Sequence, residues 1–473
     1  MLLQIIENFG QEINKKAEQL QGLLAKGNLQ GFENDLYQTV MKLYGDLAGT
    51  LINQAAATDE LRKTAKALGA SKGLKIVRKC TVGLQLRTGQ VIQTTSWYGA
   101  KRGRGNAKRC GPNGTGRHLL LDYWGCIEKA SPTYYSYATM LSVLCPSFDI
   151  VGEVLAKLQI QAEYKRIRTL AYAVGERCFA DRINVALQDE ESLAGQRVII
   201  SIDGGRTRMR EYKKSKAASK TAKGKRPSYA TPWREPKLFV IQTLNDDGKI
   251  VKEHLPLYDA VIGKPDQAFD LLAAYLKRLH IEQARQVLFI SDGAKWIWQR
   301  VAAWFARLGV AQEKLTLAVD YYHATQHIAA LLRPFTQKQL PEAQRQTLFG
   351  QLKDDLYHGR LATLIATVTK LANGRKAVLR GLDYFKTYRQ QMNYPLLRSL
   401  HLPIGSGIVE SAVRRVINLR FKSPSSFWFA GNAEKLIFLR SVCLAKRWDI
   451  MIGNLAAAVS SKLAAPLKPC FYR

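Results

Sequence analysis

The sequence is poor in acidic residues. Its 473 residues include 38 Asp and Glu against 71 Lys and Arg, which gives a formal net charge of +33. Such an excess of positive charge favours a polyanionic partner, nucleic acid before an anionic membrane surface. Against this background, a carboxylate at the end of an apolar segment needs an explanation.

Long apolar runs are missing as well. No stretch approaches the roughly 18 apolar residues of a transmembrane helix. The first residues, MLLQIIENFGQEINKK, place Glu7 and Glu12 where a signal peptide needs an unbroken apolar stretch. We therefore expect a cytoplasmic protein with no membrane partner, and the apolar content of 47% is that of a globular chain.

Closely spaced cysteine pairs are also absent. The seven cysteines are scattered singly and form no C-x-x-C motif, so neither a disulfide framework nor a zinc ribbon is indicated, and reduced thiols are expected. They are Cys80, Cys110, Cys126, Cys145, Cys178, Cys443 and Cys470.

Proline does not occur in residues 1–73, where apolar residues recur three or four positions apart, as in Leu36, Val40, Leu43 and Leu47. This pattern predicts a helical N-terminal region.

The character changes to strand and turn from residue 74. KIVRKCTVGLQLRTGQVIQTTSWYG predicts a hairpin, and the basic, glycine-rich KRGRGNAKRCGPNGTGRH follows it. The second stretch is either a DNA-phosphate contact or a solvated loop. Residues 134–190 return to helix, and two amphipathic segments there fit a helix-turn-helix and a plain helical hairpin equally well.

An α/β pattern begins at VIISID (198–203), a predicted strand. KLFVIQTLNDDGKIVKEHLPLYDAVIG predicts a hairpin that turns at 245–248, and DQAFDLLAAYLKRLH predicts a helix with Asp266 as its cap. RQVLFISD, GAKWIWQRVAAWFARLG and LTLAVD then read as strand, helix and strand. This order predicts a mixed sheet, and residues 323–401 show only helical signals.

Three apolar runs or strand ends finish in an acid: Asp203 in SIDGG, Asp292 in ISDGA and Asp320 in AVDYYH. Strand ends lie at the edge of a sheet, where α/β proteins place their sites. Asp203 and Asp292 are each followed by glycine, which allows a close approach by backbone or ligand. A turn or cap aspartate is the structural alternative for both.

A fourth acid, Glu410, lies in GSGIVESAVRRV, one turn into a helix that Ser406 is expected to cap. Its structural alternative is a surface carboxylate paired with Arg414. Clustered carboxylates suit Mg²⁺, which binds one or two of them and completes its shell with water and phosphate oxygens. Two such ions stabilise the attacking and leaving oxygens of a phosphodiester displacement.

These motifs together resemble the ribonuclease-H-like core of DDE transposases. More narrowly, SDGAKWIW, the D-x-x-H of Asp320 and His323, a helical insertion and GSGIVES resemble the Mutator-like superfamily, which includes many bacterial insertion-sequence transposases. The resemblance covers about residues 196–450. It implies an α/β fold with a ribonuclease-H-like mixed sheet, an all-helical insertion, and helical and small β regions before the core.

By this resemblance Asp203, Asp292 and Glu410 are the catalytic and metal-binding acids, holding two Mg²⁺ or Mn²⁺ ions, and Asp320 and His323 lie beside the site. Asp320 as a ligand in place of Asp292 is the alternative. His323 and His327 are spaced as zinc ligands, but no third ligand is evident.

The implied activity is cleavage at the ends of a mobile element and transfer of the 3′-hydroxyl strand to target DNA. The implied partners are double-stranded terminal repeats, target DNA and a second copy of the chain or more, in a bacterial cytoplasm at the nucleoid. The alternatives are a metal-dependent nuclease on the same core and a domesticated, non-catalytic DNA-binding protein.

The expected regions are a helical N-terminal region (1–73), a basic strand and loop region for DNA binding (74–130), a helical region (131–195), the first part of the core (196–322), the helical insertion (323–401), the second part of the core (402–455) and a C-terminal tail (456–473).

Residues 206–237 contain 12 Lys or Arg and two acids, which favours a DNA-clamping loop over a solvated one. The residues expected to contact DNA are Lys101, Arg102, Arg104, Arg206, Arg208, Arg210, Lys213, Lys214, Lys223, Lys225, Arg226, Arg414 and Arg415.

Overall fold

The computed structural model describes residues 2–100, 116–160, 162–212, 228–423 and 426–461. The chain divides into two compact units, one formed by the N-terminal part to Ala186 together with the segment from Asp449, the other by Leu187–Trp448. Within the described residues, none of the helices combines the length and the apolar character that a membrane crossing requires.

The first unit is helical apart from one small sheet, as the sequence predicts. The predicted hairpin is present as antiparallel β1 and β2, with the short β3 paired to β2. Its elements are α1 (Leu2–Ala25), α2 (Leu29–Ala56), α3 (Asp59–Ser71), β1 (Lys75–Gln85), β2 (Val91–Ala100), β3 (Arg117–His118), α4 (Leu119–Tyr123), α5 (Pro132–Leu144), α6 (Phe148–Lys157), α7 (Tyr164–Phe179), α8 (Arg182–Ala186) and α20 (Trp448–Ser461).

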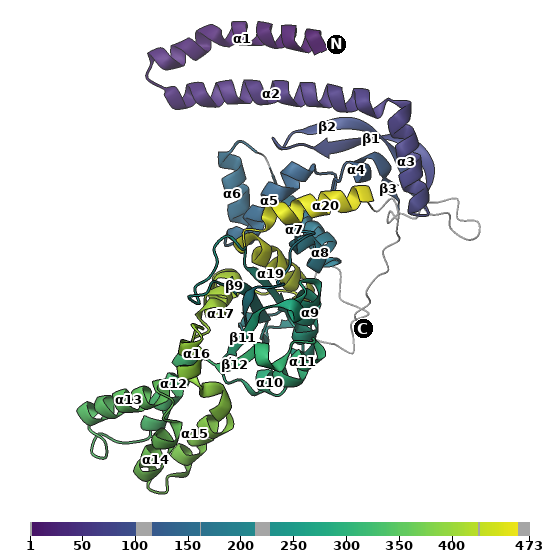
Figure 1. The fold of residues 1–473 in the computed structure, drawn as a ribbon. Coiled ribbons are helices and arrows are strands. Elements are labelled where there is room, and N and C mark those ends of the chain that lie inside the picture. Colours follow the sequence, from purple (N-terminus) through teal and green to yellow (C-terminus); the bar gives the residue numbers. More distant parts are fainter. Residues whose placement is uncertain (1, 101–115, 161, 213–227, 424–425, 462–473) are drawn as a thin grey trace. The chain divides into compact units, whose positions relative to one another are not determined.

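The second unit contains a five-stranded mixed sheet, in the order β10-β9-β4-β11-β12 (Figure 1). β9 pairs antiparallel with β4 and β10, whereas β4, β11 and β12 run parallel. The strands are β4 (Arg197–Gly204), β9 (Lys237–Leu244), β10 (Leu257–Val261), β11 (Gln286–Ser291) and β12 (Leu315–Val319). The mixed α/β prediction is therefore confirmed, and the VIISID strand lies at the centre of the sheet, with Val198–Ile202 wholly buried.

Short ribbons fill the connection from β4 to β9. β5 (Thr207–Arg208) pairs antiparallel with β8 (Trp233–Arg234), and β6 (Glu211–Tyr212) pairs with β7 (Tyr229–Ala230). The predicted clamping loop thus begins and ends as paired strands, while its central lysines lie outside the described residues.

The helices of this unit follow the predicted order with local differences. The remaining elements are α9 (Pro265–Arg278), η1 (Ile281–Gln283), α10 (Lys295–Trp298), α11 (Val301–Arg307), η2 (Gln312–Lys314), α12 (Tyr321–Leu332), α13 (Glu342–Tyr357), α14 (Leu361–Ala372), α15 (Lys376–Thr387), η3 (Arg389–Met392), α16 (Tyr394–Ser399), α17 (Gly407–Ala412), the π-helical η4 (Val413–Asn418), α18 (Leu419–Phe421) and α19 (Ala430–Leu444).

Three local predictions need correction. GAKWIWQRVAAWFARLG forms two short helices, α10 and α11, rather than one. The cap of α9 is Lys264, whose backbone N–H donates to the Gln267 side chain at 2.8 Å, while Asp266 pairs with Arg300. The turn at 245–248 forms as expected and Ile250 bridges Leu244, but the ladder is then interrupted, and the second strand begins only at Leu257.

The helical insertion shares its hydrophobic core with the sheet. Leu288 and Ile290 of β11 belong to the same buried cluster as Leu352 of α13 and Phe385 of α15. The cluster therefore runs from the strands that carry the acids into the insertion, whose helices α13, α14 and α15 extend away from the sheet (Figure 1).

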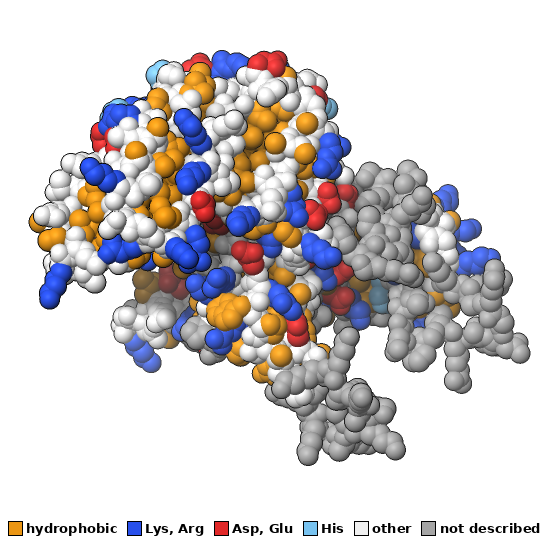
Figure 2. Space-filling model, turned by 90° about the horizontal axis from the view of Figure 1, so that it is seen from below, with side chains coloured by type: hydrophobic (Ala, Val, Ile, Leu, Met, Phe, Trp, Pro, Cys, Tyr) orange, Lys and Arg blue, Asp and Glu red, His pale blue; other side chains and the backbone are white. Residues whose placement is uncertain are grey.

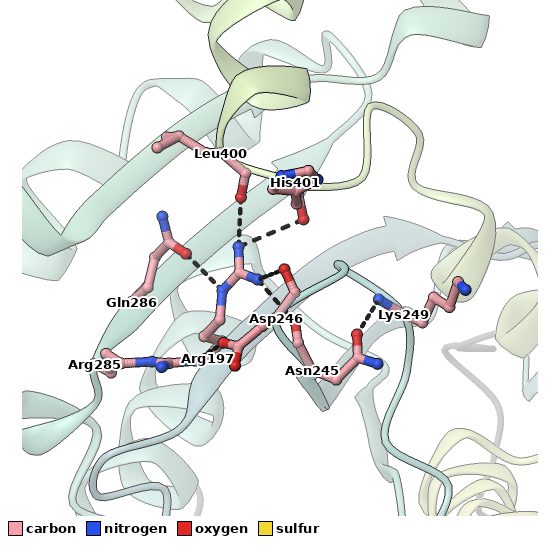
Figure 3. A network of polar contacts seen from close by, with 8 residues as sticks. All are labelled: Arg197, Asn245, Asp246, Lys249, Arg285, Gln286, Leu400 and His401. Carbon is pink, nitrogen blue, oxygen red and sulfur yellow. Dashed lines mark hydrogen bonds and ion pairs between the residues drawn. The ribbon is translucent and has the colours of Figure 1, made fainter.

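A buried arginine ties the sheet to the end of the insertion (Figure 3). The guanidinium of Arg197 donates to the Gln286 side chain at 2.8 Å, to the carbonyls of Asn245 and Asp246 at 2.8 Å each, and to the Leu400 carbonyl at 2.6 Å. Only 6% of Arg197 is exposed. Its charge is thus neutralised by oxygen dipoles from three separate segments, as a buried guanidinium requires.

Candidate functional site

The first two predicted acids lie at one edge of the sheet. β4 and β11 are parallel neighbours in which Ile200 faces Phe289, an offset of 89 residues. Asp203 and Asp292 are also 89 residues apart, so they occupy equivalent positions at the carboxyl ends of the two strands. Because parallel neighbours lie about 4.8 Å apart, this register brings the two carboxylates together.

Two buried serines join the strand ends just before these acids. The Ser201 hydroxyl donates to the carbonyl of Ile290 at 2.5 Å, and the Ser291 hydroxyl donates to the carbonyl of Ile202. Both serines are fully buried. Since each hydroxyl bonds across to the neighbouring strand, the spacing between the two strand ends is held by side chains as well as by the ladder.

The environment of Asp203 disfavours the ionised form of its carboxyl group. Burial, together with the nearby carboxylates of Asp292, Glu410 and Glu235, raises the pKa of Asp203 from 3.8 to about 6. The backbone N–H of Gly204 donates to its Oδ1 at 2.6 Å and partly opposes this rise. Within the described residues no Lys, Arg or His forms an ion pair with Asp203.

Asp292 is placed in a similar way. Burial raises its pKa, with smaller contributions in the same direction from Glu235 and Asp320, whereas the Ala294 N–H and the nearby His323 lower it. Ala294 donates to Oδ1 at 3.0 Å, and the Trp298 indole donates to the Asp292 carbonyl at 2.6 Å. The loop after β11 is therefore fixed by its own helix, α10.

Glu410 reaches the same region from a different element. It lies on α17, which packs against β4 and β9, and its charge is felt at Asp203. The residue is exposed, and the structure shows no ion pair between it and Arg414, so the paired-surface alternative is not observed in the described part of the chain. The helix continues into the π-helical η4, a form often found at functional sites.

Asp320 forms hydrogen bonds that cap α12 and hold Ser406. Its Oδ1 accepts from the backbone N–H of His323 at 2.8 Å, capping α12, and its Oδ2 accepts from both the N–H and the hydroxyl of Ser406 at 2.5 Å. Both oxygens are thus occupied, and the residue is only 1% exposed. Ser406 occupies the expected N-cap position of α17, but its hydroxyl bonds Asp320 and makes no side-chain cap bond to the helix.

One of the two histidines of α12 packs against α15. The ring of His327 stacks on Tyr384 of α15 with centroids 3.7 Å apart, and it meets His323 edge-on at 5.1 Å. Tyr384 also lies against Gly293, where an added Cβ would stand 2.1 Å from the tyrosine ring. The glycine after Asp292 is therefore required by a side chain of the insertion.

One acid near the site was missed by the sequence reasoning. Glu235, between β8 and β9, lies against Gly204, where an added Cβ would be 2.3 Å from the glutamate Oε1. It pairs with Lys237 at 3.3 Å and raises the pKa values of Asp203 and Asp292. The sequence offered one indication of Glu235: it is one of only two acidic residues in the segment 206–237, which contains 12 Lys or Arg.

The expected DNA contacts divide into three groups. Lys101, Arg102, Arg104, Lys213, Lys214, Lys223, Lys225 and Arg226 lie outside the described residues. Arg414 and Arg415 are exposed on η4, where Arg415 also donates to the Tyr258 hydroxyl at 3.2 Å. Arg206, Arg208 and Arg210 follow Asp203 directly, and Figure 2 shows Lys and Arg side chains spread over the face it presents.

The described His, Cys, Asp and Glu side chains include no group of three or more arranged to hold a metal ion. Asp203 and Asp292 are therefore a pair, with Glu410 close enough to affect Asp203 electrostatically.

No family model matches the chain, and no curated protein matches it.

Proposed function

We propose that this chain is a DDE transposase with a ribonuclease-H-like core, which cleaves DNA at the ends of a mobile element and joins the freed strand to target DNA. The observation that carries the proposal is the register of β4 and β11, which puts Asp203 and Asp292 side by side at the sheet edge. Glu410 would be the third acid, delivered by α17.

The donor set fits Mg²⁺ or Mn²⁺. Asp203 and Asp292 each accept a backbone N–H at Oδ1, and neither carboxylate forms an ion pair within the described residues, although His323 lies near enough to lower the pKa of Asp292. Mg²⁺ needs only one or two protein carboxylates, because water and phosphate oxygens complete its shell. The bound ions would activate a water molecule and stabilise the negative charge that develops on the phosphate.

The chain's own residues would prepare the site in three ways. Ser201 and Ser291 fix the spacing of the strands, and Trp298 holds the Asp292 loop. Asp320 anchors Ser406, four residues before Glu410, so that the start of α17 stays at the sheet edge. Arg206 and Arg208 would bind DNA phosphates beside the acids, with strong salt dependence.

The test uses the full-length chain and a labelled duplex that carries the inverted repeats flanking its coding region. With Mg²⁺ we expect strand cleavage and a joined product, and we expect Asp203→Ala, Asp292→Ala and Glu410→Ala each to abolish both while DNA binding persists. Asp270→Ala, at an exposed position of α9, is the matched control and should cleave normally.

Each outcome has a distinct meaning. Cleavage without joining would favour the nuclease on the same core, and binding without cleavage the non-catalytic DNA-binding protein. Full cleavage by all three acid variants would refute the site. Because two element ends must be paired, we also propose a homodimer or larger assembly, which sedimentation of the end-bound complex would detect.

A further inference from the structure

An exposed aromatic side chain lies two residues before Glu235 and has no role in the proposed function. Trp233 of β8 is 48% exposed, and the guanidinium of Arg208, its ladder partner, lies 4.9 Å from its ring centroid. Tryptophan side chains are mostly buried in folded proteins, because burial of their large apolar surface is favourable. An exposed tryptophan is therefore typical of a binding surface.

A groove opens beside this tryptophan. Its volume is about 470 Å³, within the roughly 300–1,000 Å³ of small-ligand sites. Its walls include Trp233 and Arg234 of β8, Glu235, Lys237 of β9, and Lys264 and Gln267 at the start of α9. Three cations, one anion and an indole ring thus surround a space large enough for one nucleotide.

The three cations of the groove differ in whether they already form ion pairs or hydrogen bonds. Arg234 pairs with Glu211 at 2.7 Å, and Lys237 pairs with Glu235 and donates to the Gly263 carbonyl at 3.2 Å. The exposed Lys264 side chain makes no ion pair or hydrogen bond in the described part of the chain. It is therefore the cation best able to meet an incoming phosphate.

The groove adjoins the acids through the backbone. Lys237 faces Gly204 in the β4–β9 ladder, and Glu235 lies against the same glycine, one residue after Asp203. Whatever occupies the groove is consequently a near neighbour of a phosphate bound at Asp203 and Asp292.

The ribbon offers further aromatic surface. Tyr212 and Tyr229 are 54% and 39% exposed, and the Arg210 guanidinium lies 4.3 Å from the Tyr229 ring centroid. Aromatic rings alternating with arginines are the chemistry that binds unpaired nucleotides, because bases stack on rings and cations hold the backbone. A base within a duplex is covered on both faces by its neighbours and cannot stack in this way.

We propose that this groove receives an unpaired DNA nucleotide next to the cleaved bond, with its base against Trp233 and its phosphate beside Lys264. The proposal rests on the function proposed above, since it makes the groove a subsite of that DNA-cleaving centre. The transposase would thereby hold the strand end out of the duplex while the phosphodiester is positioned at the acids.

The test measures binding without cleavage. Full-length protein in EDTA is mixed with a 30-base-pair duplex bearing a three-nucleotide 3′ overhang that contains 2-aminopurine, and with a blunt duplex carrying the same base in a pair. We expect the overhang base to be quenched on binding and the paired base to be unaffected. Trp233→Ala should bind the overhang duplex about tenfold more weakly, the change that loss of one base–aromatic stack produces.

Control variants separate stacking from folding. Trp233→Phe keeps a ring and should retain most of the quenching, whereas Lys264→Ala should weaken overhang binding with the base still quenched. Tyr44→Ala, at a 40% exposed aromatic on α2, should behave as the wild type.

The two proposals fail differently. If the wild type bound neither duplex, the DNA-directed function would be refuted. If the wild type bound both duplexes while Trp233→Ala quenched and bound the overhang equally well, the groove would not be a nucleotide site, although the cleavage function would stand.

Discussion

Replacing Asp203 by Asn is expected to stabilise the protein at neutral pH, although it removes a proposed catalytic group. Burial and the surrounding acids raise the pKa of Asp203 from 3.8 to about 6, so the folded protein holds a proton that the unfolded chain releases between these pH values. The free energy of unfolding therefore falls as the pH rises from about 4 to about 6, and stays lower above that.

The magnitude follows from the shift. About two pKa units at roughly 1.4 kcal/mol each give a penalty of about 3 kcal/mol at pH 8, which Asn removes. Asn keeps Oδ1 as the acceptor for Gly204, so the geometry should survive. For a domain of this size, about 3 kcal/mol corresponds to a rise in Tm of roughly 6–12 °C.

The assay is calorimetric unfolding of the full-length chain in EDTA at pH 4 and pH 8. We expect Asp203→Asn to raise the Tm at pH 8 and to leave it nearly unchanged at pH 4, where Asp203 is protonated in the fold. Asp270→Asn is the control and should shift neither. Added Mg²⁺ should stabilise the wild type at pH 8 more than the variant. A gain in Tm that is the same at both pH values, or no gain at pH 8, would refute the reasoning.

Three further predictions concern the supports of the site. Arg197→Ala leaves several buried carbonyls without a donor and should lower the free energy of unfolding by about 3–5 kcal/mol in urea titration; a loss below about 1 kcal/mol would contradict the network. Gly293→Ala should reduce DNA cleavage about tenfold or more because its Cβ collides with Tyr384, and adding Tyr384→Ala should restore part of the activity if that collision is the cause. Asp320→Ala should lower the free energy of unfolding by about 2–4 kcal/mol through loss of the α12 cap and the Ser406 bonds; an unchanged urea midpoint would rule out this anchoring role.

The strands could be predicted because their signals are local. VIISID, VLFIS and LTLAV are apolar runs bounded by turn residues, and each forms a strand within the same sheet. The placement of Asp203 and Asp292 at strand ends follows from these runs alone. Glu235 escaped prediction because its nearness to Asp203 depends on how β9 pairs with β4, which no local pattern encodes.

The role of Asp320 shows the limit of local reasoning most clearly. The sequence places it at the end of a strand, as it does Asp203 and Asp292. Its two oxygens are nevertheless committed to His323 and Ser406, the second of which is 86 residues away. Similar local sequences thus give Asp320, whose carboxylate is fully hydrogen-bonded, and Asp203 and Asp292, whose carboxylates form no ion pair in the described part of the chain.

The sequence by itself determined most element types, the positive charge and the positions of the acids at the ends of their strands, because propensity, periodicity and composition act over a few residues. Only the tertiary structure decided which carboxylates converge, which is already bonded, and that Trp233 stands exposed beside a basic groove. Those outcomes depend on strand register and on burial, which are set by contacts between segments far apart in the chain.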